Sequence, residues 1–117
     1  MDIAAGHLQT VKQILRRHIP DYTVWAFGSR VTGTAKPYSD LDLAVIAPQA
    51  LTLAEHAALT EAFSESDLPW KVDIADWQLI SEEFRKIIQQ QHYVIQTARN
   101  LSGCLKIKYP PCQINLF

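Results

Sequence analysis

The chain has 117 residues, enough for one domain with a single core. Apolar residues make up 48% of it and charged residues 20%, as in ordinary globular proteins. The formal charge of −1 excludes a chain-wide attraction to nucleic acid or to an anionic membrane. No apolar run approaches the roughly 20 residues of a membrane-spanning helix, and no signal-peptide pattern opens the chain, so the cytoplasm is the expected compartment.

The first half of the chain predicts one helix followed by two strands. Apolar residues at helical spacing predict an amphipathic helix over residues 3–19, and Pro20 ends it. Aromatic and branched residues predict a buried strand over residues 22–27. A second apolar run predicts another strand over residues 41–46.

The second half predicts a helix, a strand and a helix. Thr52 and Glu55 have the spacing of a capping box, which predicts a helix from there to about Glu65. Residues 70–75 predict a third strand, and Ser81 is a suitable N-cap for the last helix. The order of elements predicts an α/β (α+β) domain, in which helices cover a small mixed sheet of three or more strands.

We expect this domain to span residues 1–96 and to be followed by a tail of residues 97–117, where the periodic pattern fails. Residues 105–109 alternate between apolar and polar types, which suits an extended strand on an edge of the sheet or on a partner. Cys104 and Cys112 are either inert thiols or a disulfide that closes the tail.

Two aspartates lie two positions apart at the start of the second predicted strand, within the sequence AFGSRVTGTAKPYSDLDLAVI of residues 26–46. Because residues two apart in a strand point to the same side, Asp40 and Asp42 direct their carboxylates the same way. Two ionised carboxylates this close repel each other unless a cation neutralises them. Magnesium is usually bound by one or two carboxylates together with substrate phosphates, so the pair predicts a divalent metal site.

A glycine–serine turn precedes this pair. Gly28 lets a ligand approach the backbone, and Ser29 offers N–H and hydroxyl donors to phosphate oxygens. A phosphate-binding turn beside metal-binding carboxylates indicates a metal–nucleotide site. A P-loop is excluded, because Thr34 and Ala35 follow Gly33 where that motif requires lysine and serine or threonine.

The third predicted strand, within WKVDIADW, supplies a further acid. Asp73 lies mid-strand among apolar residues, where an unpaired carboxylate would be costly. Asp76 points to the opposite face and lies nearer the end of the strand. We therefore assign Asp73 to the metal site and Asp76 to solvent or a cap.

These residues also have simpler structural interpretations. Asp40 alone could form a turn cap with Ser39, and Arg30 and Lys36 could be solvated loop charges. The aromatic side chains could stack on bases, but their positions within strands and helices favour core packing. They are Trp25, Phe27, Phe63, Trp70, Trp77 and Phe84.

The spacing of Gly28-Ser29, ten further residues and Asp40-Leu41-Asp42 resembles the G-S-x10-D-x-D signature of the DNA polymerase β-like nucleotidyltransferase superfamily. The chain looks like a minimal nucleotidyltransferase (MNT), which consists of the catalytic domain alone, and the resemblance covers about residues 2–96. It implies the polymerase β-like nucleotidyltransferase fold and transfer of a nucleoside monophosphate, AMP from Mg-ATP, to a hydroxyl.

The resemblance also assigns roles to the site residues. It implies that Asp40, Asp42 and Asp73 bind two Mg²⁺ ions and are the catalytic acids, and that Gly28 and Ser29 hold the triphosphate. It further implies that Arg30, Lys36 and Ser39 help to bind the nucleotide. This loop departs from many MNT sequences, because Thr32 stands where they carry a second arginine.

Small MNT proteins are often antitoxins paired with a HEPN-domain RNase toxin, and they transfer AMP to a tyrosine of that toxin. The resemblance therefore implies a HEPN toxin as the partner. It also implies that the chain assembles as a hetero-oligomer or as a homodimer. Two alternatives stay open: an antitoxin that silences its partner by binding alone, and a small-molecule nucleotidyltransferase of the aminoglycoside type. Direct binding of nucleic acid is not expected, because no basic stripe offers a track.

Overall fold

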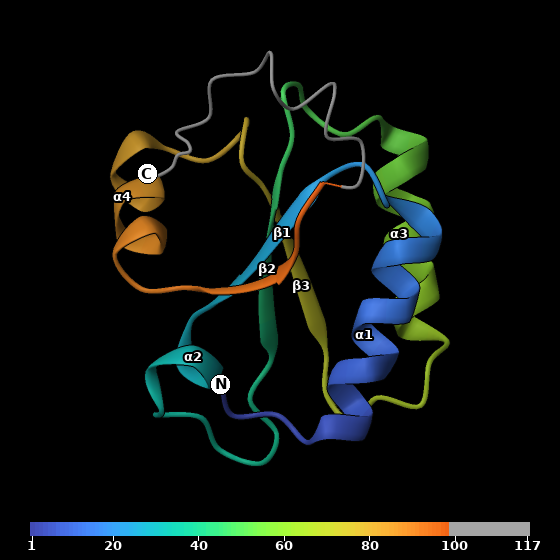
Figure 1. The fold of residues 1–117 in the computed structure, drawn as a ribbon, viewed down its shortest axis with the longest axis vertical. Helices are drawn as coiled ribbons and strands as arrows, with labels where there is room; N and C mark the ends of the chain where they lie inside the picture. Colours follow the sequence, from blue (N-terminus) through green and yellow to red (C-terminus); the bar gives the residue numbers. More distant parts are fainter. Residues whose placement is uncertain (99–117) are drawn as a thin grey trace.

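The computed structural model describes residues 1–98, in which helices cover both faces of one sheet (Figure 1). The elements in chain order are α1 (Ala5–His18), β1 (Thr23–Phe27), α2 (Ser29–Thr32), β2 (Leu41–Ile46), α3 (Leu53–Ser64), β3 (Val72–Asp76), α4 (Glu82–Gln90) and β4 (Tyr93–Gln96). The predicted mixed α/β fold is confirmed, with α2 and β4 in addition to the predicted elements. The tail features at Cys104, Cys112 and residues 105–109 lie outside the described residues.

The sheet has four strands in the order β3-β2-β1-β4. Strand β1 is antiparallel to both β2 and β4, whereas β2 and β3 are parallel. A parallel pair needs a crossover connection, and α3 provides it between β2 and β3. The register places Asp42 opposite Phe27 on one side and opposite Asp73 on the other.

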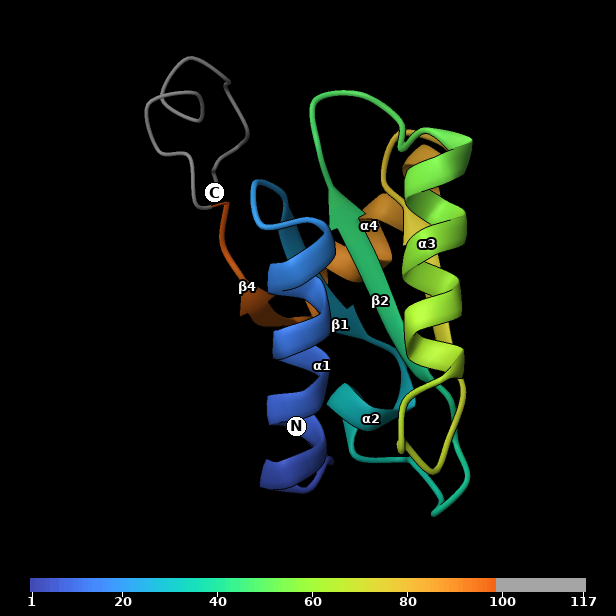
Figure 2. The ribbon, with the colours of Figure 1, turned by 90° about the vertical axis from the view of Figure 1, so that its right-hand side faces the viewer.

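Helices α1 and α3 pack side by side on one face of the sheet and bury the larger core (Figure 2). Leu15 of α1 and Leu59 of α3 are fully buried there against Leu43 of β2. The helical spacing of the apolar residues in α1 and the alternation along β2 direct these side chains toward each other.

Helix α4 covers the other face, where a smaller cluster joins Ala44 and Ile46 of β2 to Trp77 and Ile88. Trp25 of β1 stacks on the ring of His92, with ring centroids 3.9 Å apart. It also meets Trp77 edge-on, with centroids 5.5 Å apart. These contacts agree with the core-packing interpretation of these two tryptophans.

Local signals set the beginnings of two helices as predicted. The Thr52 hydroxyl accepts the N–H of Glu55 while the Glu55 carboxylate accepts the N–H of Thr52, which confirms the capping box. The Ser81 hydroxyl accepts the N–H of Phe84 and caps α4. Within residues 1–98, no helix has both the length and the apolar character needed to cross a membrane.

Candidate active site

The beginning of β2 directs two acids toward the α4 side of the sheet. Leu41 and Leu43 lie in the core under α1 and α3, whereas Ala44 belongs to the cluster under α4. Asp42 alternates with the leucines and therefore shares the face of Ala44, as does Asp40, which comes directly before the strand. The predicted common direction of the two carboxylates follows from this alternation.

Strand β3 brings Asp73 beside Asp42. The two residues are register partners in the parallel pair, and both line a cleft of about 790 Å³ that also includes Gly28. The sequence assigned Asp73 to the site because an unpaired carboxylate in an apolar strand would be costly to bury. That reason was wrong, because Asp73 is exposed. Its place next to Asp42 is a property of the sheet register. Asp40 is not among the residues that line this cleft.

The pKa of Asp42 is raised by its surroundings. Partial burial raises the pKa of this carboxyl, and the negative charges of Asp73 and Asp40 raise the same pKa further. Both neighbours therefore act on one carboxyl, although they come from different segments of the chain. A bound cation would reverse the sign of this effect.

These carboxylates suit a hard divalent cation, which prefers oxygen ligands. Among residues 1–98, no three His, Cys, Asp or Glu side chains stand close enough together to form a metal-binding group. The backbone nevertheless pairs Asp42 with Asp73 in the lining of the cleft, with Asp40 two residues away on the same face. All three supply carboxylate oxygens, so the donor chemistry fits Mg²⁺.

Gly28 is the residue that allows the turn to approach the acids. Its backbone has φ +83° and ψ −159°, a region that is essentially restricted to glycine. A Cβ atom at this position would collide with the carboxylate oxygen Oδ2 of Asp42. Helix α2 begins at the next residue, Ser29, and the first amides of a helix lack partners within it. The predicted glycine–serine turn therefore lies directly against Asp42.

The opposite wall of the cleft is apolar, and the sequence did not reveal it. Phe84, Ile87 and Ile88 of α4 face Phe27 and Ile74 of the sheet. Phe27 and Phe84 meet edge-on, with ring centroids 5.5 Å apart, and Ile87 is 61% exposed. The sequence predicted a helix after Ser81, but not that one side of this helix borders the site.

Arg30 does not take the position expected of a phosphate ligand. Its side chain is buried and donates hydrogen bonds to the backbone carbonyls of Asp2, Pro37 and Ser39. The guanidinium also lies over the ring of Trp70, 4.7 Å from the centroid. The buried position overturns the alternative of a solvated loop charge, and the filled donors disfavour direct phosphate contact.

Ser39 and Lys36 belong to the loop before Asp40. The Ser39 hydroxyl accepts the Lys36 N–H at 2.8 Å, and the Ser39 N–H donates to the Lys36 carbonyl at 3.0 Å. These bonds give Ser39 a part in shaping the loop. The side chain of Lys36 is exposed, and Thr32 lines the cleft near Gly28.

Asp76 lies on the opposite face from Asp73, as predicted, and acts as a cap. Its carboxylate accepts the N–H of Leu51 at 2.7 Å and the N–H of Gln78 at 3.0 Å. The alternative assignment of Asp76 to solvent was wrong, because the residue is buried.

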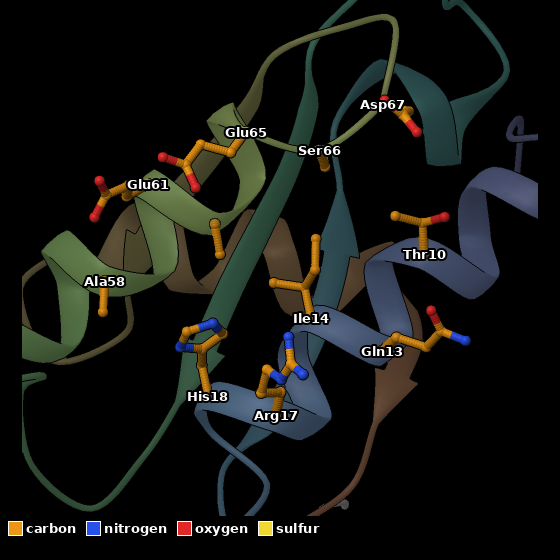
Figure 3. A pocket seen from close by; sticks show the side chains of 11 residues that line it. Thr10, Gln13, Ile14, Arg17, His18, Ala58, Glu61, Glu65, Ser66 and Asp67 are labelled. Carbon is orange, nitrogen blue, oxygen red and sulfur yellow. The ribbon is translucent and has the colours of Figure 1, made fainter.

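A second hollow lies on the far side of the sheet, between α1 and α3 (Figure 3). It measures about 760 Å³ and is lined by charges of both signs, including Arg17 of α1, Glu61 of α3 and Glu65 directly after α3. It contains none of the predicted site residues. The chemistry indicated by the sequence therefore belongs to the cleft under α4.

Comparison with known proteins identifies the family. A family model described as a nucleotidyltransferase domain matches residues 8–101. The chain belongs to the nucleotidyltransferase domain family. It is 57% identical, over 96 residues, to a Haemophilus influenzae protein described as probable protein adenylyltransferase MntA, covering 82% of this chain and 84% of that protein. The prediction of a nucleotidyltransferase is thereby confirmed at the level of the family.

Solved structures agree on the fold. One is a crystal structure of a toxin–antitoxin with AMP-PNP, with a TM-score of 0.67 and 24% identity, covering 93% of this chain and 88% of that chain. Another is a tri-AMPylated Shewanella oneidensis HEPN toxin in complex with an MNT antitoxin, with a TM-score of 0.56, 22% identity and coverage of 93% and 88%. The predicted nucleotidyltransferase fold is confirmed.

Proposed function

We propose that this chain is the antitoxin of a toxin–antitoxin pair. It transfers AMP from ATP to the hydroxyl group of a tyrosine in a HEPN-domain toxin. The observation that carries the proposal is the placement of Asp42 and Asp73 as neighbours in one cleft, against the turn at Gly28. The 57% identity to a probable protein adenylyltransferase supports the reaction. The HEPN–MNT complex among the similar structures supports the partner.

In this proposal Asp40, Asp42 and Asp73 hold two Mg²⁺ ions. Bound there, magnesium would offset the charge of the phosphates and lower the pKa of the attacking hydroxyl. Asp42 would be the central member of this set, since it is half-buried and the charges of both Asp73 and Asp40 raise its pKa. The turn at Gly28 and Ser29, where α2 begins, binds the triphosphate.

The chemical step is an in-line displacement at the α-phosphorus. The acceptor oxygen forms a bond to that phosphorus while the bond to the bridging oxygen of pyrophosphate breaks, and pyrophosphate leaves with its electron pair. Asp73 accepts the proton of the hydroxyl, because it is exposed on an edge strand that an acceptor can approach. The product is a phosphodiester between the acceptor and AMP.

The apolar wall of the cleft supports an aromatic acceptor. Phe27, Phe84 and Ile87 offer a surface against which a tyrosine ring can pack while its hydroxyl points toward Asp73. Serine or threonine would leave this wall uncovered. The acceptor is brought by another chain, which fits the role of an antitoxin.

A labelling experiment with a purified HEPN-domain toxin tests the proposal. Incubation with Mg²⁺ and ATP labelled at the α-phosphate should place label on the toxin, whereas ATP labelled at the γ-phosphate should not. Asp42→Ala should abolish the label while circular dichroism shows an intact fold. Absence of α-label, together with neutralisation of the toxin by the unlabelled complex, would instead support an antitoxin that acts by binding alone.

A further inference from the structure

Arg30 is a buried cation at the junction of four segments that surround the candidate site. Its side chain is 5% exposed. Nε and one terminal nitrogen donate to the Ser39 carbonyl at 3.0 and 2.8 Å, and the same terminal nitrogen donates to the Pro37 carbonyl at 3.2 Å. The other terminal nitrogen donates to the Asp2 carbonyl at 2.9 Å. These contacts occupy most of the five N–H donors of a guanidinium.

Three of the four segments that Arg30 joins lie next to site residues in the chain. Arg30 itself belongs to α2, which follows the turn at Gly28. Pro37 and Ser39 end the loop immediately before Asp40. Trp70, whose ring lies 4.7 Å below the guanidinium, comes shortly before Asp73. The N-terminal segment closes the arrangement, since the Asp2 N–H donates to the Arg30 carbonyl.

We propose that Arg30 is a positioning residue, which holds the loop before Asp40 against α2 and Trp70 so that Asp40 faces the same metal ions as Asp42 and Asp73. This inference rests on the proposed function for the identity of the site, and it gives Arg30 a role other than phosphate binding. The sheet ladder holds Asp42 and Asp73, but Asp40 lies outside it. Its position therefore depends on the loop.

The chemistry of the contacts requires arginine. A planar fork can donate to several carbonyls in fixed directions and stack on an indole at the same time, whereas the ammonium of lysine cannot do both. Arg30→Lys keeps the charge and removes the fork. The loop before Asp40 would then retain mainly the two bonds between Lys36 and Ser39. We expect the loop to open and Asp40 to lose its alignment.

Arg85 provides a matched control within the same molecule. Its Nε donates to the Trp77 carbonyl at 2.9 Å, and its guanidinium lies over the Trp77 ring at 5.3 Å. Arg85→Lys therefore removes an arginine–carbonyl bond and an arginine–tryptophan contact of the same kind. It does so on α4, away from the loop before Asp40.

The first measurement is hydrogen exchange of the amides of residues 34–40 in metal-free buffer. We expect Arg30→Lys to speed their exchange by about tenfold, because the loop loses charge-assisted bonds, and Arg85→Lys to leave it unchanged. The second measurement is the affinity for Mn²⁺ in the presence of a non-hydrolysable ATP analogue, read by electron paramagnetic resonance. We expect a loss of about tenfold for Arg30→Lys alone, which is typical when a group that orients a ligand is removed.

Three results would overturn the inference. A folded Arg30→Lys protein with normal exchange and normal Mn²⁺ affinity would show that the fork is dispensable. Normal exchange and Mn²⁺ affinity with weaker binding of the nucleotide analogue would make Arg30 a phosphate ligand instead. Equal effects of the two lysine variants would indicate a general loss of stability. None of these results depends on AMP transfer, so failure of the proposed function would leave this test intact.

A second variant covers the case in which Arg30→Lys does not fold. Trp70→Leu keeps the three carbonyl acceptors and removes the ring under the guanidinium. It should change exchange and Mn²⁺ affinity in the same direction by a smaller factor. Unchanged exchange at residues 34–40 in this variant would contradict the inference as well.

Discussion

The two faces of the sheet carry different kinds of residues although they share the same strands. On the α1 and α3 side, β2 contributes Leu41, Leu43 and Val45 to a continuous apolar core. On the α4 side, the same strand contributes Asp42 and then Ala44 and Ile46, so the apolar cluster is small and a cleft opens beside it. The larger face supplies stability, and the smaller face holds the acids.

This division explains how a small domain tolerates repelling carboxylates. Burial on the first face offsets the repulsion that raises the pKa of Asp42 on the second. The difference also separates the two hollows of the molecule, since the groove between α1 and α3 has charges of both signs and none of the site residues. Substitutions on the two faces should therefore have separable effects.

The two aspartates of β3 give the largest expected contrast. Asp73→Ala should lower AMP transfer by roughly 100- to 1000-fold, as removal of a charge-stabilising group does in other enzymes, with little change in stability because the side chain is exposed. Asp76→Ala should retain the activity of the folded protein and lower the free energy of unfolding by about 1–3 kcal/mol, because two backbone N–H groups lose their acceptor. Labelling assays and urea denaturation measure the two effects. The reverse pattern would contradict the assignment of the faces.

Leu59→Ala tests the stabilising face alone. Leu59 is fully buried between α3 and the sheet, so its truncation should lower the free energy of unfolding by about 2–5 kcal/mol. Because the site lies across the sheet, the protein that remains folded should transfer AMP at the normal rate. Urea denaturation and initial rates at low temperature check this expectation. A lost activity in fully folded protein would show that the two faces are coupled.

Gly28→Ala should lower both stability and activity, and Gly33→Ala is its control. Both glycines have positive φ, +83° and +89°, but a Cβ meets the Asp42 carboxylate at Gly28 and nothing within 4 Å at Gly33. We expect Gly28→Ala to lower the free energy of unfolding by about 1–3 kcal/mol and to remove most of the activity. Gly33→Ala should lower the free energy of unfolding by about 1–2 kcal/mol and leave the activity unchanged. Equal activities of the two variants would remove the steric argument for Gly28.

The smallest effect concerns the pH dependence of stability in metal-free buffer. Burial and the charges of Asp73 and Asp40 raise the pKa of Asp42, so folding favours its protonated form. Its contribution is fully present below the ordinary pKa of aspartate and is lost as the pH rises through the raised pKa. Asp42→Asn should therefore raise the Tm at neutral pH by no more than a few degrees, since water screens a half-exposed group, and the gain should vanish in acid.

Calorimetry of the wild type and Asp42→Asn across about pH 4 to 8 measures this difference. Added Mg²⁺ should stabilise the wild type and have little effect on the variant. A variant that is less stable than the wild type at neutral pH, without metal, would contradict the repulsion inferred at Asp42.

The sequence by itself determined the features that depend on near neighbours in the chain. Strand β2 has the predicted bounds, because a run of apolar residues between a polar loop and Pro48 leaves little choice. The capping box fixes the beginning of α3, and alternation along a strand places Asp40 and Asp42 on one side. Helix α2 and β4 were missed, since four residues each are too few to show a period.

Tertiary structure decided what depends on residues far apart in the chain. Asp73 meets Asp42 because α3 returns the chain parallel to β2, and β4 is a strand because its backbone pairs with β1. Arg30 had the sequence context of a phosphate ligand, yet its donors face carbonyls of Asp2, Pro37 and Ser39. Local patterns specify which way a side chain leaves the backbone, whereas its partners depend on how distant segments pack.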